Sequence, residues 1–197
     1  MLETELKSIV DDFEGRQARA QDAGARLVFS GTLVDWRYDR RKRRLLARDH
    51  VLRLRVQSHG QHTQAWLEWK GPTRYAAGYK LREEISTEVV DRTATAAMLD
   101  RLGYIITREI EREVFTYELK GAVIRFERYP RMDDLVEIEG TPDAIERAIE
   151  VIGIPRLLFS SDGLPEFARR FEERTGERAA LCARELAGDY TYDLDEA

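Results

Sequence analysis

The sequence has little of what several large classes of protein depend on. It holds one cysteine, Cys182, which excludes an internal disulfide framework and a zinc site built from thiolates. Its three histidines are too few to favour a histidine-based metal centre. No apolar run approaches the roughly 18 residues that a membrane-spanning helix needs, and the first residues lack the basic and apolar stretches of a secretory signal. These absences predict a soluble, cytoplasmic protein.

Charge, by contrast, is abundant and nearly balanced. Charged residues make up 35% of the 197 residues, where an average globular chain has roughly 25%. The 32 basic and 37 acidic residues leave a formal net charge of −5. Apolar residues recur with the periods of strands and helices, which excludes a disordered chain. Because the length suits one domain and the sequence shows no linker or repeat, we expect a single domain.

The periodicity predicts more strands than helices. Alternating segments predict strands at about 2–10, 27–38, 51–57, 63–70, 79–90, 104–118, 122–129 and 134–140. Helical composition with start and stop signals predicts helices at about 11–24, 93–102, 143–152 and 165–175. This order of elements favours an α+β fold with a mainly antiparallel sheet.

The charges in these strands gather on one face. Residues two apart in a strand share a face, so Glu3, Glu5 and Lys7 point the same way, as do Arg53 and Arg55. The same spacing recurs in the pairs Glu68 and Lys70, Arg82 and Glu84, Arg125 and Glu127, and Glu137 and Glu139. A sheet with one face in water has a similar pattern. Because these faces hold almost only Arg, Lys and Glu, we favour the inside of a closed barrel whose apolar outer face is covered by helices.

Such a charged interior suits one kind of ligand. Arginine and lysine side chains grip phosphate oxygens, whereas clustered carboxylates suit Mg²⁺ or Mn²⁺, which prefer oxygen ligands and bridge to substrate phosphates. Together they indicate a metal-bound polyphosphate. The sequence has neither the glycine-rich loop of the P-loop enzymes nor the glycine fingerprint of a dinucleotide site.

The same residues form an ordered series of motifs over about residues 3–140. The series is Glu3-Thr-Glu-Leu-Lys7, Tyr38-Asp39 followed by Leu52-Arg-Leu-Arg55, Trp69-Lys-Gly-Pro72, Arg82-Glu-Glu84, Arg112-Glu113, Glu127 and Glu137-Ile-Glu139. This series resembles the CYTH superfamily, also called the triphosphate tunnel metalloenzymes. That superfamily includes class IV adenylyl cyclases, thiamine triphosphatases and inorganic triphosphatases.

The resemblance implies an α+β fold whose eight-stranded antiparallel β-barrel, at about 2–140, forms a tunnel with a charged lumen. Outer helices cover it, and a helical segment follows at about 143–180 within one domain, 1–197. The cationic residues expected to hold the triphosphate and assist catalysis are Lys7, Arg53, Arg55, Lys70, Arg82 and Arg112, with Arg125 as a further substrate-binding residue. The carboxylates expected to hold Mg²⁺ or Mn²⁺ are Glu3, Glu5, Glu84, Glu127, Glu137 and Glu139.

Two positions depart from the family pattern. Ile110 stands where a lysine is usual, unless Arg108 substitutes from two residues earlier, and Glu127 stands where aspartate is usual. The basic run at 40–44 is expected to be a solvated loop at the tunnel mouth.

The expected function is metal-dependent hydrolysis of an inorganic or organic triphosphate. One alternative is a class IV adenylyl cyclase that converts ATP to cyclic AMP and pyrophosphate, and a second is a non-catalytic polyphosphate-binding domain. The expected partners are a triphosphate or nucleoside triphosphate and, by resemblance, a second copy in a homodimer. We expect no membrane or nucleic-acid partner.

Overall fold

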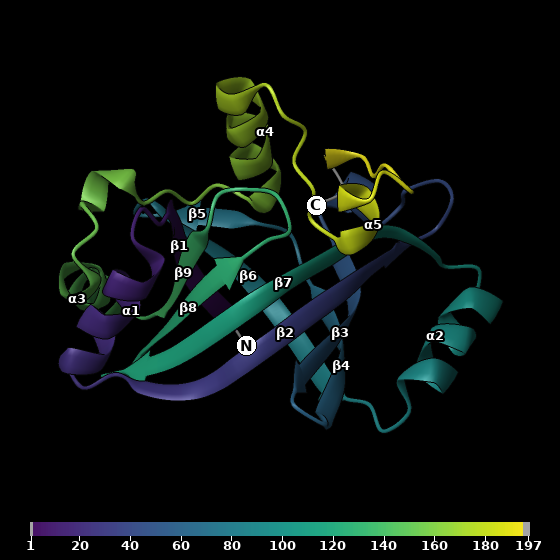
Figure 1. Cartoon of the computed structure of the whole chain (residues 1–197). Helices are drawn as coiled ribbons and strands as arrows, with labels where there is room; N and C mark the ends of the chain where they lie inside the picture. The colour runs from purple at the N-terminus through teal and green to yellow at the C-terminus, as the bar shows by residue number, and fades with distance from the viewer. Residues whose placement is uncertain (1, 195–197) are drawn as a thin grey trace.

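The computed structural model describes residues 2–194 and places nine strands in that range. They are β1 (Leu2–Ile9), β2 (Arg26–Asp39), β3 (Val51–His59), β4 (His62–Lys70), β5 (Arg74–Ala76), β6 (Tyr79–Glu88), β7 (Ile105–Leu119), β8 (Ala122–Arg128) and β9 (Leu135–Gly140). Neighbours pair in the order β1-β9-β8-β7-β2-β3-β4-β6, and β1 also pairs with β6. The expected eight-stranded antiparallel barrel is therefore confirmed (Figure 1). The short β5, which the sequence did not predict, is added beside β6.

Within residues 2–194 the structure also has five helices. They are α1 (Phe13–Asp22), α2 (Arg92–Arg101), α3 (Pro142–Ile152), α4 (Leu164–Thr175) and α5 (Ala183–Leu186). Side-chain caps explain where several begin: Asp12 accepts a hydrogen bond from the backbone of Gly15, and Thr141 accepts one from Ala144. Gly153 ends α3 in the left-handed region, with φ at 71°. None of these helices is long and apolar enough to cross a membrane.

The main apolar core lies outside the barrel, between its outer face and the helices. Leu6 of β1, Phe126 of β8 and Ile138 of β9 are buried there against Phe13 of α1 and Ile145 of α3. Figure 1 shows α1 and α3 together at one end of the barrel and α4 above it. Because successive side chains of a strand point to opposite faces, burial of the apolar residues outside directs the charged residues into the barrel.

Candidate tunnel site

The barrel encloses a cavity of about 470 Å³ lined mainly by charged side chains. Every sequence-predicted site residue lines this cavity. They are Lys7, Arg53, Arg55, Lys70, Arg82, Arg112, Arg125, Glu3, Glu5, Glu84, Glu127, Glu137 and Glu139. The face on which each charge lies thus agrees with the two-residue strand period.

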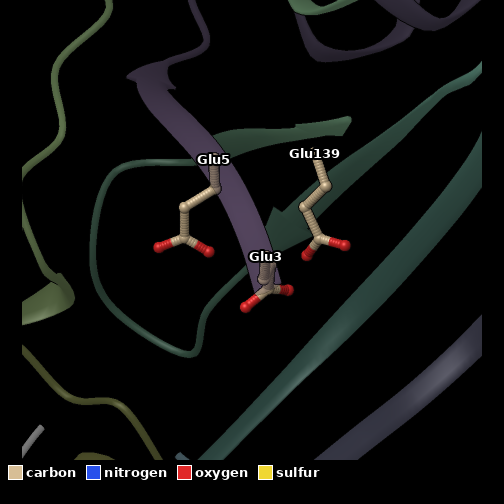
Figure 2. A group of neighbouring side chains, drawn as sticks. All are labelled: Glu3, Glu5 and Glu139. Carbon is tan, nitrogen blue, oxygen red and sulfur yellow. The ribbon is translucent and has the colours of Figure 1, made fainter. Parts of the chain in front are cut away.

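Three of the carboxylates converge. Glu3, Glu5 and Glu139 each offer an oxygen, and these oxygens lie within 4.8 Å of one another (Figure 2). Strand pairing brings them together, because Glu5 of β1 lies directly opposite Glu139 of β9. A set of carboxylate oxygens at this spacing fits a hard divalent cation such as Mg²⁺ or Mn²⁺. We call these three residues the acidic cluster.

Two other predicted metal ligands are bound to cations. Glu137 accepts hydrogen bonds from Lys7 and Arg125. Glu127 accepts one from Arg112 Nε at 2.7 Å and one from the hydroxyl of Tyr129 at 2.6 Å. The structure therefore places Glu3, Glu5 and Glu139 in the acidic cluster and pairs Glu127 and Glu137 with cationic side chains.

The pKa values of the crowded carboxyl groups shift in different directions. Burial raises the pKa of Glu84 to about 7, and its hydrogen bond with Glu3 adds to that rise. Burial also raises the pKa of Glu139 well above its usual value, and the nearby charges of Glu137 and Glu3 add to that shift. By contrast, Lys7 and Lys80 lower the pKa of Glu5 despite its burial. Without a metal ion, the site therefore holds protons on some of its carboxylates near neutral pH.

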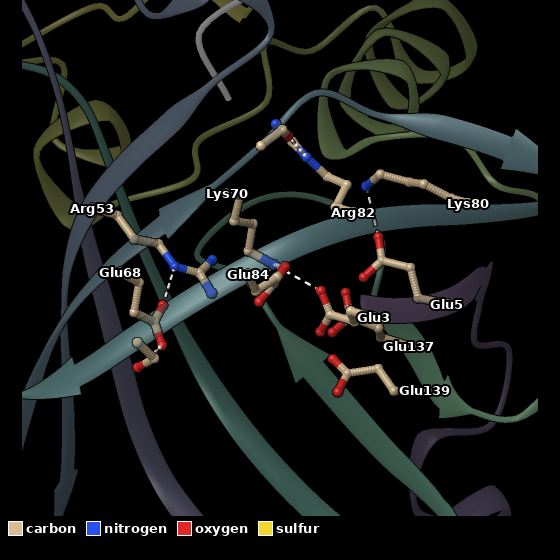
Figure 3. Close-up of polar contacts among 12 residues, drawn as sticks. Glu3, Glu5, Arg53, Glu68, Lys70, Lys80, Arg82, Glu84, Glu137 and Glu139 are labelled. Carbon is tan, nitrogen blue, oxygen red and sulfur yellow. Dashed lines mark hydrogen bonds and ion pairs between the residues drawn. The ribbon is translucent and has the colours of Figure 1, made fainter. Parts of the chain in front are cut away.

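Lysines and an arginine surround the acidic cluster (Figure 3). Lys70 Nζ lies 3.0 Å from Glu3 and also pairs with Glu84. Lys80 Nζ lies 2.6 Å from Glu5. Arg82 instead donates to the backbone oxygen of Gly71 at 2.7 Å and to that of Asp49 at 2.6 Å, which holds two loops beside the cavity. Cations thus lie beside the carboxylates, as binding of metal and phosphate together requires.

A second group of cations surrounds Asp35, which lies on β2 and is 1% exposed. Arg55 donates from Nε and Nη2 to its two carboxylate oxygens at 2.7 and 2.9 Å. Arg112 Nη1 lies 3.1 Å from Asp35 Oδ2, and Arg53 Nη1 lies 3.5 Å from the same oxygen. Burial alone would raise the pKa of Asp35, but the three arginines hold it well below its usual range.

The sequence reasoning missed several polar and charged cavity-lining residues, among them Asp35, Arg37, Lys80 and Tyr129. Strand parity could have found Asp35, Arg37 and Lys80. Asp35 and Arg37 alternate with apolar residues of β2, and Lys80 shares its parity with Arg82 on β6. Tyr129 follows the end of β8, so no strand period marks it.

Arg108 does not replace the missing lysine in the cavity. Its Nη1 and Nη2 donate to the carboxylate of Glu185 at 3.0 and 2.9 Å. Its side chain is fully buried and is not part of the cavity lining, whereas Ile110 is. The lysine position of the family motif is therefore apolar in this tunnel.

Comparison with known proteins agrees with this architecture. Residues 1–151 match the family model of the CYTH domain. This chain belongs to the CYTH family. No match was found among curated proteins.

Solved structures show the same CYTH fold at low sequence identity. A candidate adenylate cyclase from Vibrio parahaemolyticus aligns with a TM-score of 0.72 and 17% identity, over 85% of this chain and 97% of its own. The PH1819 protein of Pyrococcus horikoshii gives a TM-score of 0.69 and 22% identity, over 82% and 94%. HpAC1 from Hippeastrum is a candidate adenylyl cyclase described as having a dominant triphosphatase activity. It aligns with a TM-score of 0.61 and 14% identity, over 91% of this chain and 98% of its own.

Proposed function

We propose that this CYTH protein is a divalent-metal-dependent hydrolase of a triphosphate-containing substrate. The observation that carries the proposal is the tunnel itself, in which one closed barrel places the acidic cluster beside cations from several strands. The triphosphatase activity named for HpAC1 supports the same reaction class.

In this proposal the cations hold and orient the phosphate groups. Lys7, Lys70, Lys80, Arg53 and Arg112 line the cavity and present donors that strengthen as charge develops on the transferring phosphoryl group. Arg82 and Arg125 extend this set. Arg55 lies deeper, bound to Asp35.

The residues that would hold the metal are Glu3, Glu5 and Glu139, with Glu84 beside them. A divalent ion bound there supplies neutralisation of phosphate charge and polarisation of the reacting oxygens. In the hydrolytic reaction water adds to the terminal phosphorus while the bond to the bridging oxygen breaks. Inorganic phosphate and the shortened chain leave.

A cyclase is the second candidate, because the cavity also offers aromatic surface. Tyr75 lines it and is 67% exposed, and His50 lines it with its ring packed edge-to-face on Trp69. Such rings can stack on a nucleobase. In that reaction the ribose 3′-hydroxyl attacks the α-phosphorus and pyrophosphate leaves. The structural neighbour from Vibrio parahaemolyticus is named for this activity.

Product analysis tests the proposal. The protein is incubated with Mg²⁺ or Mn²⁺ and either tripolyphosphate, thiamine triphosphate or ATP, and the products are resolved by phosphorus NMR. Release of inorganic phosphate supports hydrolysis. Formation of cyclic AMP and pyrophosphate from ATP would refute hydrolysis and identify a cyclase. Tight binding without turnover would identify a non-catalytic polyphosphate-binding domain.

A further inference from the structure

Asp35 and its three arginines lie apart from the acidic cluster along the barrel wall. Lys70 of β4 contacts Glu3 of the cluster and faces Val51 on β3. Arg53 and Arg55 follow Val51 on β3 by two and four residues, so they lie progressively farther along the strand from Lys70. At about 3.3 Å per residue, Arg55 lies roughly 13 Å along the strand from Val51.

The row of charged side chains along the inner face of β3 ends at Arg55. Arg53 faces Glu68 on β4, and Arg55, one step deeper, faces Asp35 on β2. The next residue of β2 on the same face as Asp35 is Leu33, which is fully buried. The position of β2 that follows Asp35 on this face is therefore apolar, and Arg112 of β7 lies opposite it.

Arg55 is already paired with carboxylates of the protein. Its Nε and Nη2 make the side-on pair with Asp35 that guanidinium groups also make with phosphate. Its Nε lies 3.7 Å from Glu68 as well. A carboxylate fixed to the barrel thus occupies the position that a phosphate group would take at this arginine.

We propose that Asp35 sets the maximum length of the phosphate chain: with Leu33 it ends the phosphate-binding track at Arg53 and Arg112 and excludes a further phosphate group. This inference rests on the proposed function and names a specificity determinant of the same site. Asp35 acts through Arg55 and by repulsion, and it makes no contact with the reacting phosphorus. The low pKa of Asp35 supports this role, because its carboxylate is charged at neutral pH.

The test is Asp35→Asn, which keeps a hydrogen-bond acceptor and removes the charge. Dissociation constants for tripolyphosphate and tetrapolyphosphate are measured by calorimetry without added metal, so that no turnover occurs. The wild-type protein should bind tripolyphosphate at least about tenfold more tightly, a difference of about 1.4 kcal/mol. In the variant that ratio should fall about tenfold, because Arg55 becomes available and the repulsion is gone. An equal change for both chain lengths would show a merely structural role and overturn the inference.

A matched control separates this effect from the loss of any buried carboxylate. Glu185→Gln removes a buried, arginine-bound carboxylate outside the cavity lining. Its ratio of affinities for the two chain lengths should equal that of the wild type. A ratio that shifts as much in Glu185→Gln as in Asp35→Asn would also overturn the inference.

A second variant serves if Asp35→Asn does not fold. The double variant Asp35→Asn/Arg55→Gln removes one charge of each sign and should keep the tripolyphosphate affinity within about threefold of the wild type, well under one tenfold step of 1.4 kcal/mol. A loss of about a hundredfold would show that Arg55 is itself a phosphate ligand and would refute the inference. Wild-type protein that binds neither chain without metal and hydrolyses neither chain with Mg²⁺ would refute the proposed function as well. An unchanged ratio of affinities in Asp35→Asn would refute only the role of Asp35.

Discussion

Replacement by glutamine should destabilise the metal-free protein strongly at Glu5 and only slightly at Glu139, because the pKa values of these two carboxyl groups shift in opposite directions. Burial raises the pKa of Glu139 well above its usual value even though Arg125 Nη1 lies 2.9 Å from its carboxyl group, so we expect Glu139 to hold a proton in the metal-free protein. Glutamine at this position then replaces a neutral group by a neutral group. Glu5, by contrast, is ionised and accepts hydrogen bonds from Lys7 Nζ at 3.1 Å and Lys80 Nζ at 2.6 Å.

The structure sets the size of each effect. Removing one partner of a buried ion pair costs about 3–5 kcal/mol. Glu5→Gln should fall near 3 kcal/mol, because Lys7 keeps Glu137 as a partner. For a chain of this length, 1 kcal/mol corresponds to about 2–4 °C, so the unfolding temperature should drop by roughly 6–12 °C. Glu139→Gln should change the metal-free stability by less than about 1 kcal/mol, since no charge is lost.

Metal binding should not distinguish the two variants. Each removes one anionic oxygen ligand from the acidic cluster, and loss of residues that merely support a ligand already costs about 10–100-fold in affinity. Both variants should therefore lose at least about a hundredfold in Mg²⁺ affinity and in metal-dependent activity.

The assay is urea denaturation with and without Mg²⁺, together with calorimetric titration of the metal. A metal-free Glu139→Gln protein as destabilised as Glu5→Gln would refute the protonation assigned to Glu139. Unaltered Mg²⁺ affinity in both variants would refute the metal site.

Three further outcomes are expected. Between about pH 4.5 and pH 7 the metal-free protein should lose stability as the pH rises, because the raised pKa of Glu84 makes the folded state bind that proton more tightly than the unfolded chain. Urea denaturation across this range should show the fall, added Mg²⁺ should reverse it, and a flat profile would contradict the assignment. Arg112→Lys should lower the free energy of unfolding by about 3 kcal/mol and raise KM for tripolyphosphate, because one ammonium group cannot bridge Asp35 and Glu127. Steady-state kinetics and urea denaturation check both effects. A KM and a free energy of unfolding equal to those of the wild type would show that the contacts of Arg112 with Asp35 and Glu127 do not matter. Glu185→Gln should lower the unfolding temperature but leave that KM unchanged, and a raised KM would place its ion pair in the substrate path.

The barrel and the identity of most tunnel residues could be predicted from the sequence. Strand parity is a local property, since it depends only on the alternation of side chains along one strand. Glu3, Glu5 and Lys7 could therefore be assigned to one face without knowledge of their partners. The ordered motifs then indicated that this face lies inside a closed barrel, and the pairing of β1 with β6 confirms the closure.

Tertiary structure alone decided which of these side chains meet. Glu139 joins Glu3 and Glu5 because the register of β1 and β9 sets it opposite Glu5, while Glu127 binds Arg112. Partners across a barrel depend on register and closure, which no short stretch of sequence contains.

The same reason explains two residues whose roles the sequence could not show. Asp35 shares its face of β2 with the cavity residue Arg37, but only the approach of β3 and β7 surrounds it with three arginines. Arg108 has the parity of a tunnel residue, yet Glu185 near the far end of the chain binds it outside the cavity lining. The sequence by itself indicated which charges face inward, and the folded barrel determined which carboxylates converge in the acidic cluster, which cations lie beside them and which charges bind one another.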